Sequence, residues 1–201
     1  MNTVDENFTE FIYQQIELYG DDPVISKDFF LQIDKKIDII QNELLFCEGN
    51  PEAELVLITE ASRTAGEPLG SFFKDEPGFL LEKILKSINF DRKDVLVCSF
   101  TKSDSQNKND ESNILKQTLF HIEKQLESVE PAFILCLGKL AGQMLLQNHQ
   151  DIDSLHGEIF DYKNSKLLVT YHPKILMSDP ALKRTTWEDI QILQRIYNKW
   201  K

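Results

Sequence analysis

Apolar and polar positions along the chain follow two different repeating patterns. Near the N-terminus, apolar residues recur every three or four positions in ENFTEFIYQQIELYG and SKDFFLQIDKKIDIIQNELL, which predicts two amphipathic helices. Further along, short continuous apolar runs rich in β-branched residues predict buried strands in ELVLIT, DVLVCSF, AFILCL and KLLVTY. Unbroken apolar runs are typical of parallel strands, because a parallel sheet is covered by helices on both faces.

Helical patterns separate these strands: GFLLEKILKSI, SNILKQTLFHIEKQLESV and KLAGQMLLQN. The alternation predicts an α/β fold with three layers, in which an open, mainly parallel four-stranded sheet is flanked by helices. GEIFDY is expected to form a hairpin with KLLVTY. The chain should close with a helix that has Asp179 as its N-cap and Pro180 at its first position. We place the domain boundary after Ala53, with residues 1–53 as an acidic helical extension and residues 54–201 as the α/β domain.

Composition narrows the class of protein. A chain of 201 residues with 41% hydrophobic residues is long enough for one sizeable core. No apolar run reaches the roughly 18 residues that span a bilayer, and the acidic N-terminus lacks the pattern of a signal peptide. We therefore expect a cytoplasmic protein without a membrane partner. The cysteines are Cys47, Cys98 and Cys136, and the last two lie in apolar runs, which predicts buried thiols and not disulfides.

The net charge of −11 argues against a nucleic-acid partner, because phosphate contacts need lysine and arginine. The distribution of charge weakens this objection. Residues 1–53 hold 12 acidic and 3 basic residues, whereas residues 163–201 hold 8 basic and 3 acidic ones. Two interpretations stay open for the C-terminal segment: a basic face that binds DNA, or an ordinary solvated helix surface.

Ligands of open α/β sheets bind at the carboxyl ends of the strands. The first predicted strand ends in Glu60 and is followed by Phe72 and Phe73, and the last strand delivers His172 and Pro173. A carboxylate, an aromatic pair and an imidazole at one edge could bind a flat ring and stabilise charge on both sides of a breaking bond. Each residue also has an ordinary structural alternative: a turn cap for Glu60, core packing for the aromatics, and a backbone hydrogen bond for His172.

The order of the motifs resembles the uracil-DNA glycosylase superfamily, and within it the family 4 branch. That branch typically reads GEAPG, GxPFVGxAGxLL, TNVVKCRPP, ALGxxAAxxLL and TYHPxxLLxxP with a closing WEDL. The corresponding segments here are TEASR, GSFFKDEPGFLL, DVLVCSFTKSD, CLGKLAGQMLL and TYHPKILMSDP with WEDI. The resemblance implies a DNA glycosylase that hydrolyses the N-glycosidic bond of uracil or a related damaged base in base excision repair.

The resemblance also implies roles for the site. Glu60 falls on the acid that orients the attacking water and stabilises the cationic sugar, and His172 on the donor to a carbonyl oxygen of the leaving base. Phe73 falls on the residue that stacks on the flipped base. Ser99 falls on an asparagine that reads the uracil edge, and Ala61 is placed with these two residues in the substrate-binding set.

The segment 174–178 falls on a loop that wedges into DNA in the family. An apolar Leu176 or Met177 at its tip would suit intercalation, and the proline would fix the angle at which the loop begins. The residues expected to contact DNA are Pro173, Lys174, Leu176, Met177, Lys183 and Arg184.

Several positions depart from the family. The first motif is TEASR, without the two glycines, and Ser103 and Thr118 stand at two of the four cysteine positions of the family. We therefore expect no iron–sulfur cluster, no other metal and no cofactor. Whether the chain is an enzyme stays open at this point. The alternative is a degenerate glycosylase fold that binds DNA or protein, as in the psi subunit of bacterial DNA polymerase III, with the acidic N-terminal helices contacting a protein partner.

Overall fold

A computed structural model describes residues 45–60, 76–100 and 108–201 of the chain. The chain divides into two compact units, Met1–Ile40 and Gln41–Lys201, and every described element belongs to the second. The predicted N-terminal helices lie outside the described residues. In chain order the elements are β1 (Leu45–Gly49), β2 (Leu55–Glu60), α3 (Glu76–Ser87), the short 3-10 helix η1 (Arg92–Asp94), β3 (Val95–Phe100), α4 (Lys108–Val129), β4 (Phe133–Leu137), α5 (Lys139–Leu146), α6 (Ile152–Leu155), β5 (Ile159–Tyr162), β6 (Ser165–Thr170), α7 (Pro173–Ser178) and α8 (Leu182–Trp200).

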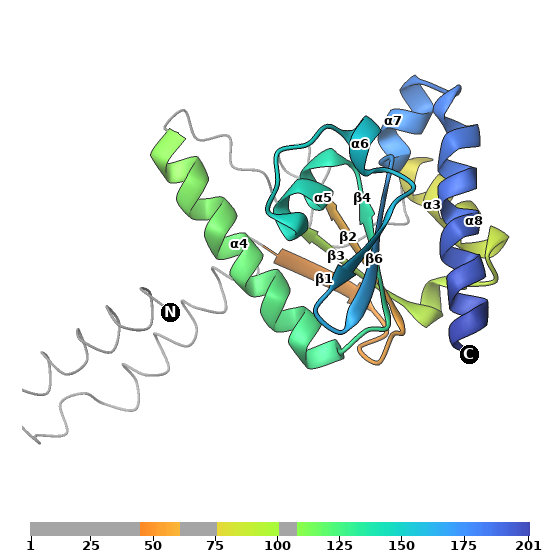
Figure 1. The fold of residues 1–201 in the computed structure, drawn as a ribbon, viewed down its shortest axis with the longest axis horizontal. Coiled ribbons are helices and arrows are strands. Elements are labelled where there is room, and N and C mark those ends of the chain that lie inside the picture. The colour runs from red at the N-terminus through yellow and green to blue at the C-terminus, as the bar shows by residue number, and fades with distance from the viewer. Residues whose placement is uncertain (1–44, 61–75, 101–107) are drawn as a thin grey trace, which may run out of the picture. The chain divides into compact units, whose positions relative to one another are not determined.

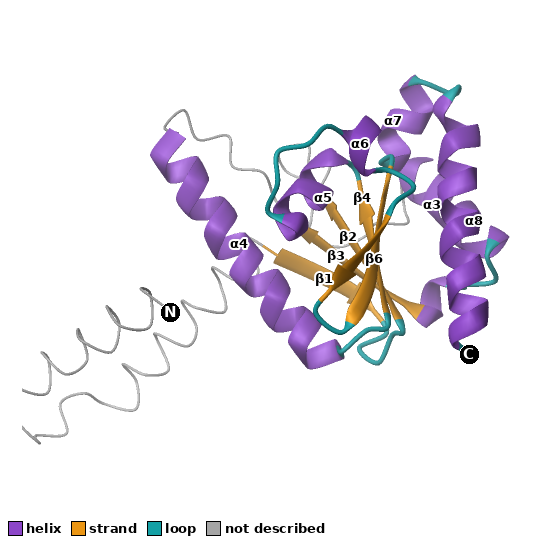
Figure 2. Cartoon of the chain, in the orientation of Figure 1, coloured by secondary structure: helices purple, strands orange, loops and turns teal. Residues whose placement is uncertain are grey.

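The described strands form one six-stranded sheet in the order β1-β3-β2-β4-β6-β5 (Figure 2). The four central strands are the four predicted apolar runs, and they are parallel to one another. Both edges are antiparallel: β5 pairs with β6 as the predicted hairpin, and β1 pairs with β3. The α/β class and the parallel centre of the sheet are thus confirmed, and the edge strands enlarge it.

Helices cover both faces of the sheet, so the three predicted layers are present (Figure 1). Alternate residues of each central strand point to opposite faces, which gives two separate cores. Val56, Ile58 and Cys136 belong to the core that also contains residues of α4 and α5. Leu57 and Leu135 belong to the other core, which contains residues of α3 and α8. Each helix layer therefore packs on its own side of the sheet.

The strand β1 was not predicted, and it changes the interpretation of the cysteines. Its register places Cys47 directly opposite Cys98 on β3, with 4.1 Å between the two Cα atoms. The two residues form a disulfide, so the expectation of a free thiol at Cys98 is wrong. Cys136 is a free buried thiol as expected, and burial raises its pKa. Because β1 lies in the sheet, the α/β unit also begins ahead of Glu54.

The region after β6 differs from the prediction in two ways. Residues 173–178, expected as a loop, form the short helix α7. The closing helix α8 begins at Leu182, two residues beyond Pro180, with Ala181 as its N-cap. Asp179 still helps its start, because its side chain accepts a hydrogen bond from the Ala181 backbone N–H at 3.1 Å. None of the helices among the described residues is long and apolar enough to cross a membrane.

Candidate functional site

Glu60 and His172 lie at the same edge of the sheet. Glu60 is the last residue of β2, and His172 follows the end of β6. The strand β4 lies between β2 and β6, so the two residues follow strands that are two spacings, roughly 10 Å, apart. Both side chains are half-buried. The carboxylate of Glu60 and the imidazole of His172 therefore lie on the two sides of β4, at the carboxyl edge of the parallel strands.

The imidazole of His172 is held in a defined state by the helix that it caps. Its Nδ1 accepts a hydrogen bond from the backbone N–H of Lys174 at 3.0 Å, and Pro173 occupies the first turn of α7. A nitrogen that accepts a hydrogen bond carries no proton, so the neutral ring has its proton on Nε2. Protonation of Nδ1 would break this bond and place positive charge at a helix N-terminus. For the neutral ring, this contact therefore selects the tautomer in which Nε2 carries the proton.

Gly138, which follows β4, fits closely against His172. A Cβ atom at this position would lie 3.2 Å from the Cβ of His172, and the glycine has a φ of +98° that other residues rarely adopt. Its backbone N–H also donates to the Thr170 carbonyl oxygen at 2.8 Å. The sequence contained GKLAG at this strand end, but a glycine after a strand indicates only a turn and not the neighbour that it contacts.

A buried carboxylate on α8 supports the end of β6. Asp189 is 3% exposed, and its Oδ2 accepts a hydrogen bond of 2.6 Å from the hydroxyl of Thr170. Its Oδ1 lies 3.2 Å from Nδ1 of His156. Burial raises the pKa of Asp189, and the hydrogen bonds from Thr170 and His156 oppose that shift. No sequence motif marks this cluster of Thr170, His156 and Asp189, because its members are far apart in the chain.

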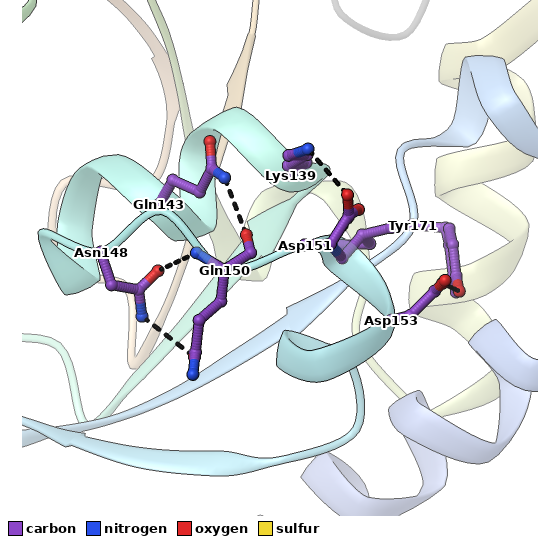
Figure 3. Close-up of polar contacts among 8 residues, drawn as sticks. Lys139, Gln143, Asn148, Gln150, Asp151, Asp153 and Tyr171 are labelled. Atoms are coloured by element: carbon purple, nitrogen blue, oxygen red, sulfur yellow. Dashed lines mark hydrogen bonds and ion pairs between the residues drawn. The ribbon is translucent and has the colours of Figure 1, made fainter.

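Polar contacts also fix the segment between α5 and β5 (Figure 3). Lys139 at the start of α5 forms an ion pair of 3.0 Å with Asp151, and this pairing lowers the pKa of the Asp151 carboxyl. The hydroxyl of Tyr171 donates to Asp153 at 3.0 Å. Burial, with that hydrogen bond, raises the pKa of Tyr171 to about 12. The residue immediately before His172 is therefore a neutral, buried tyrosine.

The short helix α7 presents two apolar side chains to solvent. Ile175 is 46% exposed and Met177 is 38% exposed, whereas Leu176 is 1% exposed. The expectation that Leu176 contacts DNA stays a prediction, and in this structure its side chain lies in the interior. The predicted contact of Met177 with DNA stays a prediction. Ile175 is exposed on the same helix, although the motif pattern did not single it out. Because residues 173–178 form a helix, the side chain of Leu176 points into the core, whereas a loop would not impose this orientation.

The other expected site residues are placed as follows. Lys174, Lys183 and Arg184 are exposed, and Arg184 forms an ion pair of 3.1 Å with Glu188. Ser99 is 4% exposed and lies on β3 opposite Thr59. Pro173 is buried at the start of α7. Ala61 and Phe73 lie outside the described residues.

The fold and this edge define an α/β protein with a carboxylate and an imidazole on opposite sides of one parallel strand. Comparison with known proteins gives its family. The model of the uracil DNA glycosylase superfamily matches residues 46–191, and the chain belongs to that superfamily. The resemblance found in the motifs is thereby confirmed.

The relatives include type-4 uracil-DNA glycosylases of three archaea. The chain is 26% identical over 160 residues to that of Archaeoglobus fulgidus, covering 75% of this chain and 80% of the relative. It is 28% identical over 155 residues to that of Saccharolobus solfataricus, with coverages of 72% and 71%. For that of Sulfurisphaera tokodaii the identity is 24% over 159 residues, with coverages of 74% and 72%.

The family 4 resemblance implies an iron–sulfur cluster held by four cysteines, and the residues of this chain do not fit one. The chain has three cysteines, of which Cys47 and Cys98 are joined to each other. Thr118, at one of the family's cysteine positions, is a buried hydroxyl on α4. Across the described ranges, no three histidine, cysteine, aspartate or glutamate side chains gather as a metal site. We derive no step through a metal.

Proposed function

We propose that the chain is a DNA glycosylase that hydrolyses the N-glycosidic bond of uracil or a related damaged base. The observation that carries the proposal is the placement of Glu60 and His172 on the two sides of β4, with Nδ1 of His172 accepting a hydrogen bond from the backbone N–H of Lys174. Membership of the uracil-DNA glycosylase superfamily supports the same activity.

In the proposed reaction, the bond between the sugar C1′ and the base nitrogen breaks, and its electron pair leaves with the base. Nε2–H of His172 donates to the carbonyl oxygen on which negative charge develops. The carboxylate of Glu60 stabilises the positive sugar and orients a water molecule, whose oxygen bonds to C1′ while its proton passes to the carboxylate. A neutral donor suits this role, because it stabilises the anion without giving up its proton.

The target base must leave the duplex to reach this edge. We assign base binding to Ala61, Phe73 and Ser99, and DNA contacts to α7 and the start of α8. Lys174, Lys183 and Arg184 would contact phosphates, and the exposed Met177 and Ile175 would enter the space left by the flipped nucleotide. The cytoplasm is the compartment in which we expect this activity.

A second candidate function is a binding module without catalysis. The observation that favours it is Ser99, which is 4% exposed and offers one short hydroxyl where the family presents an amide. The altered motif TEASR points in the same direction. In this alternative the fold binds DNA or a protein, with the acidic residues 1–53 as the contact to a protein partner.

Single-turnover cleavage assays would decide between the two candidates. Oligonucleotides with uracil opposite guanine, opposite adenine and in single strand are incubated with the protein and then treated with alkali. The wild type should produce strand scission, Glu60→Ala should abolish it, and His172→Ala should slow it by at least about tenfold. Scission that persists in Glu60→Ala would indicate a contaminant. Absence of scission on every substrate would favour the binding module.

A further inference from the structure

The strand end that precedes His172 is attached to α8 through one hydrogen bond between buried side chains. Thr170 is fully buried, and its hydroxyl donates to Oδ2 of Asp189, itself 3% exposed, at 2.6 Å. Only Tyr171 separates Thr170 from His172 in sequence. The bond therefore connects α8 to Thr170, the last residue of β6, two residues before His172.

The second oxygen of Asp189 connects a third segment to the same point. It lies 3.2 Å from Nδ1 of His156, and a Cβ added at Gly157 would lie 2.7 Å from it. The imidazole of His156 also packs against the ring of Tyr171, with 5.1 Å between the ring centroids. One carboxylate thus contacts three segments: α8, which carries it, the end of β6 two residues before His172, and the turn before β5.

This arrangement complements the contact within α7. The hydrogen bond from Lys174 to His172 fixes the imidazole relative to α7, but it does not fix α7 relative to the sheet that carries Glu60. The bond from Thr170 to Asp189 adds a side-chain constraint at the end of β6, where the backbone of Thr170 is already paired with β4 and accepts a hydrogen bond from Gly138. A donor contributes to catalysis only when it is held within a few tenths of an ångström of its working position.

We propose that Thr170 and Asp189 are a positioning pair for His172, which makes the hydroxyl of Thr170 a determinant of the rate although it touches neither base nor sugar. The inference rests on the proposed glycosylase function. It concerns two residues for which the sequence motifs gave no role. It also explains why a carboxylate is kept in the interior, where burying charge costs free energy unless hydrogen bonds compensate for it.

Conservative variants of Thr170 test the pair. Thr170→Val keeps the β-branched shape and removes the donor, whereas Thr170→Ser keeps the donor. Thr186→Val is the matched control, because Thr186 is a threonine on α8 that is 2% exposed and whose hydroxyl has no partner within the described part of the chain. We expect Thr170→Val to lower the single-turnover rate by about five- to tenfold, while the other two variants stay within about twofold of the wild type. An equal loss of rate in Thr186→Val would overturn the proposal, since it would show a general effect of packing on α8.

Nitrogen-15 NMR of the imidazole side chains gives a readout that does not depend on turnover. The His172 signals are assigned by their loss in His172→Gln of the full chain. They should move in Thr170→Val and stay in place in Thr170→Ser and Thr186→Val. Unmoved His172 signals in Thr170→Val would overturn the positioning role, even in an active enzyme. An inactive wild type would refute the proposed function alone, and the NMR comparison would still decide on the pair.

Discussion

Asp189 shows how a single residue can be costly to stability and useful to a site. Its pKa is raised by burial in spite of its two hydrogen bonds, so the folded state holds the proton more tightly than the unfolded state does. The associated stabilisation is complete below the ordinary aspartate pKa, and it is lost as the pH rises through the raised pKa of the folded state. Raising the pH across this range therefore costs the folded state more free energy at Asp189 than it costs the unfolded state.

The variant Asp189→Asn removes this cost and keeps an oxygen that can accept from Thr170. We expect its free energy of unfolding to increase relative to the wild type as the pH is raised from about 4 to 7. Urea titrations of both proteins at several pH values measure the difference. A constant difference between the two proteins across this range would contradict the assigned direction of the pKa shift.

At the scale of elements, α7 places the neighbouring residues Leu176 and Met177 in different environments, one in the core and one at the surface. Leu176 is buried, and truncation of a buried leucine typically costs 2–5 kcal/mol. Leu176→Ala should therefore lower the free energy of unfolding by about 2–5 kcal/mol, as measured by urea unfolding.

Met177 is the control for Leu176, since it lies next in the chain and is 38% exposed. Met177→Ala should leave the free energy of unfolding within about 0.5 kcal/mol of the wild type. It should instead weaken binding to DNA that carries a non-cleavable uracil analogue, as measured by fluorescence anisotropy. Unchanged affinity in Met177→Ala would exclude its side chain from the DNA contact.

The disulfide between Cys47 and Cys98 joins the edge strand β1 to the middle of β3 and closes a loop over a sequence separation of 51. Cross-links of this span restrict the unfolded chain, and their loss typically costs about 2–4 kcal/mol. Urea unfolding with and without dithiothreitol should show a destabilisation of that size in the wild type. Cys47→Ser should be equally unstable in both conditions, and a response of this variant to the reductant would assign the effect to another cause.

The elements that could be predicted best from the sequence were those with a clear pattern of apolar residues. The four parallel strands and the hairpin followed from apolar runs and a turn, and parallel strands necessarily bring Glu60 and His172 to one edge. The strand β1 was missed because LFCEG is short and contains a glutamate and a glycine. Gly138, Asp189 and the inward turn of Leu176 depend on contacts between distant segments, which a local pattern does not contain.

At the scale of the whole molecule, the proposed function requires a chain with a net charge of −11 to approach a polyanion. In the C-terminal segment the acid Glu188 is paired with the base Arg184, so these two charges offset each other. The exposed cations Lys174 and Lys183 remain near the proposed DNA contact. Binding should therefore depend on a small number of phosphate contacts, and its affinity should fall only moderately as salt is added, because the salt dependence scales with the number of phosphates contacted.

The slope of the logarithm of the DNA association constant against the logarithm of salt concentration measures these contacts. Lys174→Gln and Lys183→Gln should each reduce the slope by about one. Lys124→Gln is the matched control, because this lysine on α4 has a side chain that is 63% exposed and forms an ion pair with Glu127. Helix α4 belongs to the other layer of the sheet, so the control should keep the wild-type slope. An unchanged slope in the first two variants would move the DNA contact elsewhere.

The hydrogen bond between the Lys174 backbone and His172 joins the proposed leaving-group donor to the helix that we propose contacts DNA. Any tilt of α7 as it engages a duplex is transmitted to the imidazole. A free nucleoside does not press on α7, so it would meet the donor in its resting orientation. If the proposed glycosylase function holds, we therefore expect discrimination against free deoxyuridine to arise at the bond-breaking step as well as in affinity.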